Sequence, residues 1–150
     1  AVTSDQPLDI RPQKTRVISP GIGAGIVSGG NLATLCHLVG TPYSPTYRDC
    51  LFVVEDIEEA PYKIDRMLFQ MRLAGCFEGI SGVVLGSFHD CGRYEMICEI
   101  VGKIFADNQI PILGGFEIGH GDDNVTIPMG IQATLDTEQG ALVYQETALL

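Results

Sequence analysis

The chain has few basic residues and no long apolar run. Its 150 residues include 9 lysines and arginines against 19 aspartates and glutamates, which gives a formal net charge of -10. Such a charge repels phosphate backbones, so we do not expect nucleic acid as a partner. Every wholly apolar run is far shorter than the roughly 18 residues that a membrane span needs, so we do not expect membrane insertion either.

Paired cysteines and a signal peptide are also missing. The five cysteines are an odd number at irregular spacings without a CxxC pair, which argues against a disulfide framework and a zinc site. The first residues lack the charged-then-apolar layout of a signal peptide. We therefore expect a protein of a reducing cytoplasm without metal or cofactor. Because the chain begins at Ala1 rather than at a methionine, we also expect a preceding segment outside this sequence.

The sequence does contain an alternation of buried strands and amphipathic helices. Short apolar runs predict strands, and apolar residues three and four apart predict helices. The strands are expected over 16–20, 51–54, 82–86 and 110–113, the helices over 32–39, 61–74 and 94–106, and a hairpin over 131–135 and 141–144. This order predicts an α/β domain that has a mostly parallel sheet, flanking helices and an antiparallel C-terminal hairpin.

Glycine and proline indicate the boundaries of this domain. Residues 1–15 are polar, contain two prolines and show little periodicity, which is typical of a linker. Residues 16–150 then form the folded domain. Residues 20–31 hold five glycines, too many for a helix, so we expect a turn or bulge there between two short extended pieces.

Two side chains could carry chemistry together. Glu55 directly follows the buried strand 51–54, and His120 lies in a glycine-flanked loop after strand 110–113. In a parallel sheet both strands end at the same edge, so Glu55 and His120 can meet there. A carboxylate that accepts from one imidazole nitrogen leaves the other free as a general base. We expect the two groups within about 2.6–3.2 Å.

Glu55 and His120 also have simpler, non-catalytic interpretations. Glu55 is followed by further acids, as in a solvated loop, and glycines around a histidine can mark only a tight turn. The pair also lacks a nucleophile, because no GxSxG motif occurs and Ser28, Ser81 and Ser87 do not stand at a strand-to-helix turn. Either the pair is not catalytic, or its serine lies upstream.

Other motifs give weaker signals. Gly29–Asn31 lacks both the GxGxxG spacing and the lysine of a phosphate-binding loop. His89 and Cys91 could suggest a cysteine hydrolase or a metal site, but close neighbours on an extended segment diverge. Tyr62 and Arg66, one helical turn apart, are expected to stack on the helix surface.

Seven motifs in order along the chain resemble the C-terminal domain of the LD-carboxypeptidase family of serine peptidases, which includes muramoyl-tetrapeptide carboxypeptidases and microcin-immunity peptidases. The similarity covers about residues 16–146. The motifs are Gly29-Gly30-Asn31-Leu32, Gly40-Thr41-Pro42, Phe52-Val53-Val54-Glu55-Asp56, Pro61-Tyr62 with Ile64-Asp65-Arg66, Gly82-Val83-Val84-Leu85-Gly86, Gly119-His120, and Ile127-Pro128-Met129-Gly130.

The resemblance implies a swivelling-type C-terminal domain and a serine–glutamate–histidine triad. Glu55 and His120 match the family's glutamate and histidine, whereas its serine belongs to an N-terminal domain that this sequence lacks. It further implies removal of the terminal D-alanine from murein tetrapeptides in bacterial peptidoglycan recycling, an inactive isolated fragment, and a possible homodimer. A microcin-type hydrolase of peptide conjugates and a non-catalytic ligand-binding or interaction domain remain alternatives.

Overall fold

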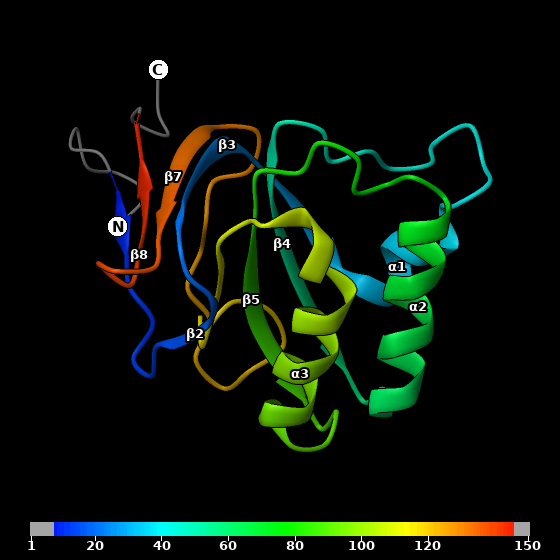
Figure 1. The fold of residues 1–150 in the computed structure, drawn as a ribbon. Coiled ribbons are helices and arrows are strands. Elements are labelled where there is room, and N and C mark those ends of the chain that lie inside the picture. Colours follow the sequence, from blue (N-terminus) through cyan, green and yellow to red (C-terminus); the bar gives the residue numbers. More distant parts are fainter. Residues whose placement is uncertain (1–7, 146–150) are drawn as a thin grey trace.

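One curled sheet with helices on one face organises the chain (Figure 1). The computed structural model describes residues 8–145; the first part of the predicted linker, 1–7, and the last five residues, 146–150, lie outside that range. The elements are β1 (Asp9–Ile10), β2 (Arg16–Ser19), β3 (Ile22–Asn31), α1 (Leu32–His37), β4 (Cys50–Ile57), α2 (Pro61–Leu73), β5 (Gly82–His89), α3 (Tyr94–Ile104), a 3₁₀ turn (Ala106–Asn108), β6 (Ile112–Gly114), β7 (Gln132–Asp136) and β8 (Ala141–Tyr144).

The middle of the sheet is parallel and its edges are antiparallel. The strand order within the described residues is β1-β8-β7-β3-β4-β5-β6-β2. Strands β3, β4, β5 and β6 pair in parallel, whereas β2 and the strands from β7 outward pair antiparallel. The predicted α/β class, its parallel centre and its C-terminal hairpin are therefore confirmed. The parallel strands end together at one edge, which is where the sequence places its candidate side chains.

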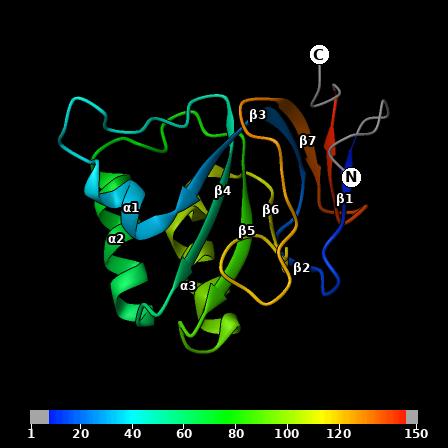
Figure 2. The same ribbon diagram turned by 180° about the vertical axis from the view of Figure 1, so that it is seen from behind.

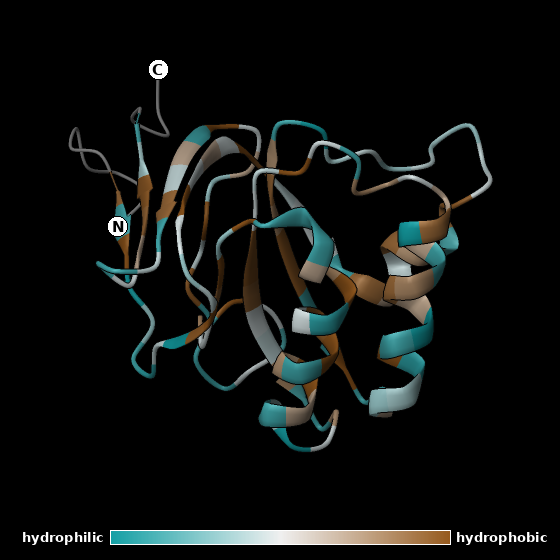
Figure 3. Cartoon of the chain, in the orientation of Figure 1, coloured by the Kyte–Doolittle hydropathy of each residue, from teal (hydrophilic) through white to brown (hydrophobic). Residues whose placement is uncertain are grey.

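The amphipathic helices cover one face of the parallel strands. Each buries a stripe of residues three and four apart, as the periodicity predicts. The buried stripes are Leu32 and Cys36 of α1, Ile64, Leu68 and Met71 of α2, and Ile97, Val101 and Ile104 of α3. Figure 3 shows the hydrophobic strands behind helices whose outer surfaces are largely hydrophilic. The contacts of this layer are with β-strand residues such as Phe52, Val54, Val83 and Leu85.

The opposite face of the sheet is covered by the chain itself. The sheet curls so that β7 and β8 contribute to a second core, and the segment between β6 and β7 runs in front of the strands in Figure 2. Phe116 and Ile118 of that segment are buried against Val53, Val84 and Leu113. The loop that carries His120 is therefore fastened to the sheet by two apolar anchors immediately before it.

Three of the predicted boundaries differ in the structure. Residues 22–31 form the continuous strand β3 rather than turns, because they pair with β4 on one side and β7 on the other. Glycine suits this strand because neighbouring backbone lies very close; a Cβ on Gly25 would approach the carbonyl oxygen of Asp49 to 2.5 Å. Strand β4 also continues past the apolar run to Ile57, so Glu55 lies within it. Residues 9–10 of the predicted linker pair with β8 as strand β1.

Gly29 and Gly30 offer a matched test of this close packing. Both have φ near +146° (148° and 144°), but a Cβ on Gly29 would collide with the Val53 carbonyl, whereas one on Gly30 meets nothing within 4 Å. Gly30→Ala should lower the free energy of unfolding by about 1–3 kcal/mol through backbone strain alone. Gly29→Ala should cost about 1–3 kcal/mol more because β4 must move. Urea unfolding measures both, and equal losses would contradict the collision.

Candidate active site

Glu55 is a buried carboxylate at the carboxyl edge of the sheet. It belongs to β4, pairs with Asn31 of β3, and is only 6% exposed. Glycine supplies the space around it: a Cβ on Gly86 would lie 3.2 Å from the Cβ of Glu55, and one on Gly119 would lie 2.6 Å from its Cγ. A buried carboxylate needs partners for its oxygens. Within residues 8–145, both hydrogen bonds to the Glu55 carboxylate come from His120.

His120 meets the Glu55 carboxylate twice. Its Nδ1 lies 2.7 Å from Oε2 of Glu55, and its backbone N–H donates to the same oxygen at 3.3 Å. The predicted distance of about 2.6–3.2 Å thus holds for the side chains. With Nδ1–H donating to the carboxylate, Nε2 carries the lone pair. The ring is 51% exposed, and Nε2 makes no hydrogen bond to another group in residues 8–145.

The loop that carries His120 is tied to β5. The carbonyl of Ile118 accepts from the backbone N–H of Ser87 at 2.8 Å and from its hydroxyl at 2.9 Å. Asn124 closes the loop by accepting from the N–H of Gly119 at 3.2 Å. These bonds hold the imidazole against Glu55. They also use the hydroxyl of Ser87, which therefore serves the loop and not the imidazole.

The carboxylate changes the acidity of the imidazole. The hydrogen bond and the charge of Glu55 raise the pKa of His120 above its ordinary value of 6.5, and the charge of Asp56 adds to this. A histidine whose folded pKa is raised stabilises the fold below the unfolded pKa, about 6.5. That contribution is lost as the pH rises through the higher folded pKa.

This pKa shift can be measured directly. In the chain labelled with ¹³C at histidine Cε1, NMR titration should give His120 a pKa above 6.5. Glu55→Gln removes the charge but leaves an oxygen at the same place, so the pKa of His120 should fall toward 6.5. A wild-type His120 that titrates at or below 6.5 would show that the contact does not form in solution.

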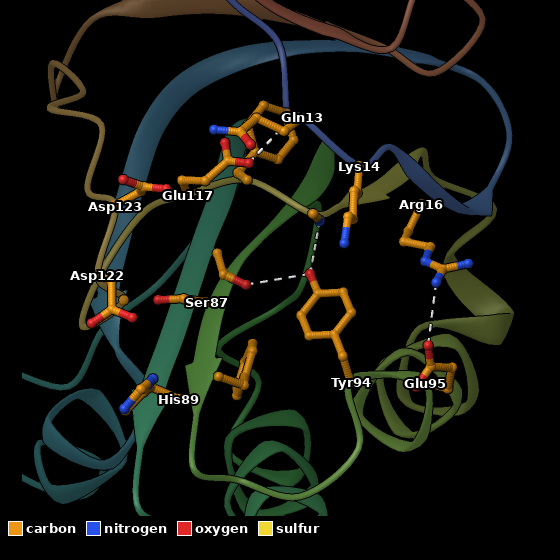
Figure 4. A pocket seen from close by; sticks show the side chains of 15 residues that line it. Gln13, Lys14, Arg16, Ser87, His89, Tyr94, Glu95, Glu117, Asp122 and Asp123 are labelled. Carbon is orange, nitrogen blue, oxygen red and sulfur yellow. Dashed lines mark hydrogen bonds and ion pairs between the residues drawn. The ribbon is translucent and has the colours of Figure 1, made fainter.

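A cleft of about 570 Å³ adjoins the loop (Figure 4). Its walls are Gln13, Lys14 and Arg16, the end of β5, the start of α3, and residues 115–117 and 121–123, which flank His120 on both sides in the sequence; Glu55 and His120 themselves do not line it. Tyr94 supports it, because its hydroxyl accepts from the N–H of Gly115 at 2.8 Å and donates to the Gly86 carbonyl at 3.3 Å. Figure 4 shows the amine of Lys14 and the carboxylate of Asp122 on opposite sides of the opening. The cleft therefore presents both signs of charge next to the loop that carries His120.

The other candidates do not assemble into a site. The Cys91 thiol is buried and donates to the backbone carbonyl of His89 at 3.3 Å, while the His89 ring faces Asp90 at 3.4 Å. Thiol and imidazole therefore have different partners. Arg66 lies over the Tyr62 ring at 5.4 Å, as predicted, on the surface of α2.

Asn31 has a structural task rather than the phosphate-binding one considered from the sequence. Its Oδ1 accepts from the N–H of Thr34 at 3.0 Å and caps α1. Its Nδ2 donates to Asp56 at 3.0 Å. Asp56 was not singled out as a site residue from the sequence, because its partners lie 23 and 25 residues away in the chain.

Fold and site together define a class: an α/β domain that carries a carboxylate–histidine pair at the carboxyl edge of parallel strands. Within that class, a family model described as the LD-carboxypeptidase C-terminal domain matches residues 24–135. The chain belongs to the LD-carboxypeptidase family, and the part of the family it matches is the C-terminal domain. The resemblance inferred from the motifs is confirmed.

Named relatives agree with this assignment. The chain is 34% identical, over 84% of its length and 41% of the relative, to the "Probable murein peptide carboxypeptidase" of Bacillus subtilis. It is 32% identical, over 83% of its length and 38% of the relative, to the microcin C7 self-immunity protein MccF of Escherichia coli. The crystal structure of muramoyltetrapeptide carboxypeptidase from Oxalobacter formigenes superposes with a TM-score of 0.79 at 28% identity, covering 95% of this chain and 50% of that one.

The chain spans about half the length, or less, of the relatives it matches. Within residues 8–145, no helix is both long and apolar enough to span a membrane. The same residues contain no cluster of three or more histidine, cysteine, aspartate or glutamate side chains placed to bind a metal ion.

Proposed function

We propose that this chain is the C-terminal half of a serine-type LD-carboxypeptidase that removes the terminal D-alanine from murein tetrapeptides. The observation that carries the proposal is the 2.7 Å contact between Nδ1 of His120 and the buried carboxylate of Glu55, at the two positions that match the family's histidine and glutamate. The segment that supplies the serine precedes this chain in the whole protein. On this proposal the isolated chain lacks the nucleophilic serine and is therefore inactive.

The geometry supports an acyl-transfer mechanism. Nε2 of His120 takes the proton from the serine hydroxyl as the serine oxygen attacks the carbonyl of the L,D peptide bond. Glu55 holds the ring in the required tautomer and stabilises its protonated form. The imidazolium then gives its proton to the leaving amine, and D-alanine departs. Water, activated by the same imidazole, hydrolyses the acyl-enzyme and frees both the serine and the shortened peptide.

The cleft beside the loop gives the substrate a place to lie. A peptide substrate of a carboxypeptidase ends in a carboxylate, and Lys14 is a cation at the opening that has no ion-pair partner within residues 8–145. The opposing acids suit an amine elsewhere in the substrate. This proposal implies an enzyme of peptidoglycan recycling in the bacterial cytoplasm. The partner of this chain is then its own N-terminal domain.

A peptide conjugate of the microcin type is the second candidate substrate. The observation in its favour is the similarity to MccF, a structure of which contains glutamyl sulfamoyl guanosine and superposes with a TM-score of 0.78 at 27% identity. Both substrates would use the same Glu55–His120 pair. They differ in the group that leaves, so they can be compared in one assay.

The test uses the whole protein, expressed from the complete reading frame that contains this chain. It is incubated with murein tetrapeptide, with the same peptide ending in L-alanine, and with an aminoacyl sulfamoyl nucleoside, and products are measured by mass spectrometry. Release of D-alanine from the first substrate alone supports the proposal. Preferential cleavage of the nucleoside conjugate supports the microcin-type activity, and cleavage of none supports a non-catalytic binding domain.

A further inference from the structure

A second carboxylate stands directly behind the proposed catalytic one. Asp56 follows Glu55 on β4 and projects to the opposite face of the strand, toward α1. It is only 1% exposed. The mechanism above makes no use of it, yet a buried carboxylate is costly unless its oxygens are fully hydrogen-bonded.

Three donors satisfy Asp56. Its Oδ1 accepts from Nδ2 of Asn31 at 3.0 Å and from the N–H of Ile57 at 2.9 Å, and its Oδ2 accepts from the N–H of Ala33 at 3.1 Å. These donors come from the end of β3, the first turn of α1 and β4 itself. All three donate hydrogens, so the site fits an ionised carboxylate. One side chain thus fastens three elements together at the position next to Glu55.

The sheet needs this fastening because its ladder is interrupted beside Glu55. Val54 pairs with Leu85 and Asp56 pairs with Phe88, so β5 holds two residues where β4 holds only Glu55. The extra residue is a β-bulge, and it turns the N–H of Ser87 toward the His120 loop. Because Glu55 has no paired residue on β5, the pairing with β5 does not by itself fix the orientation of the Glu55 side chain.

We infer that Asp56 is a positioning residue for the Glu55–His120 pair. It anchors β4 to β3 and α1 across from the bulge, and its charge also favours the protonated imidazole that forms during the reaction. This inference rests on the proposed function, because positioning matters only if the pair is catalytic.

Few charged groups surround His120 and Asp56. His120 experiences Glu55 and Asp56, both of which raise its pKa. The pKa of Asp56 is raised above its ordinary value, because burial, the largest influence, together with the charge of Glu55 outweighs the three donors that lower it. On the helix side, the buried Cys91 thiol is affected by Asp56, Glu59 and Asp90, and burial raises the pKa of that thiol. The thiol therefore stays protonated and adds no charge near the pair.

The test is Asp56→Asn in the whole protein, beside Glu58→Gln as the matched control. Glu58 is an exposed acid two residues further along, so its variant removes one charge without breaking a buried contact. Asp56→Asn should lower kcat about 10- to 100-fold with KM changed less than about twofold. The acid limb of the kcat/KM profile should move to lower pH, because His120 loses a neighbouring charge that raises its pKa. Glu58→Gln should leave all three unchanged.

Asp56→Asn with wild-type kcat and an unmoved acid limb would overturn the inference, and so would an equal effect of Glu58→Gln. If Asp56→Asn does not fold, Asn31→Ala removes one donor and leaves every charge in place. By histidine NMR without substrate, this variant should then shift the pKa of His120 toward its ordinary value; an unchanged pKa would overturn the inference. If the wild-type protein releases no D-alanine, the proposed function fails, while the NMR result still decides whether Asp56 positions the pair.

Discussion

Replacing His120 with alanine in the whole protein should lower kcat for D-alanine release by about 10⁵- to 10⁶-fold, the loss seen when a triad's base is removed. His120 is the only group in residues 8–145 that contacts the Glu55 side chain through a hydrogen bond, and its ring is half exposed for a serine to approach. Without it, the serine has no base and the leaving amine has no acid. Single-turnover measurement of D-alanine release gives the chemical step directly.

The carboxylate of Glu55 should matter nearly as much as the imidazole of His120. Glu55→Gln keeps the shape of the side chain but removes the charge that stabilises the imidazolium, so kcat should fall about 10⁴-fold with KM little changed. Because the two residues act as a unit, the double variant should be no worse than His120→Ala alone. His37→Ala, on the exposed surface of α1, is the control that should keep full activity. Additive losses in the double variant would contradict a shared mechanism.

The meeting of Glu55 and His120 could be predicted because it follows from topology. Parallel strands end at one edge, and both residues follow or end such strands, 65 positions apart. The apolar stripes of α2 and α3 were equally predictable, because helical periodicity is a local property. Each of these predictions needs only the order of the elements and the spacing of apolar residues.

The extent of β3 and β4 was not predictable in the same way. Glycine favours turns when it is considered alone, and only the neighbouring backbone of β4 and β7 makes a strand of residues 22–31. Two acids at the end of β4 look like a solvated loop until their partners His120 and Asn31 are known. Local pattern therefore fails where distant residues supply both the ladder and the partners of buried charge.

Gly119→Ala should abolish most of the activity although it replaces neither proposed catalytic side chain. A Cβ at this position would overlap Oε2 of Glu55 and lie 2.7 Å from its Cδ. Gly119 also has φ +108°, where residues with a side chain are strained. Both effects push the His120 loop away from the carboxylate, and a misplacement of about 1 Å costs on the order of 100-fold in rate. We expect kcat to fall about 10²- to 10³-fold, measured by D-alanine release.

Gly130→Ala separates the two causes of this loss. Gly130 also has a left-handed φ, +78°, but a Cβ there meets nothing within 4 Å. It should therefore suffer backbone strain of about 1–3 kcal/mol in unfolding free energy and keep its rate. The pKa of His120 should drop toward its ordinary value in Gly119→Ala alone, because only that variant separates the imidazole from Glu55. A fully active Gly119→Ala protein would mean that the carboxylate can leave this position during catalysis, so that the 2.7 Å contact is not what orients the base.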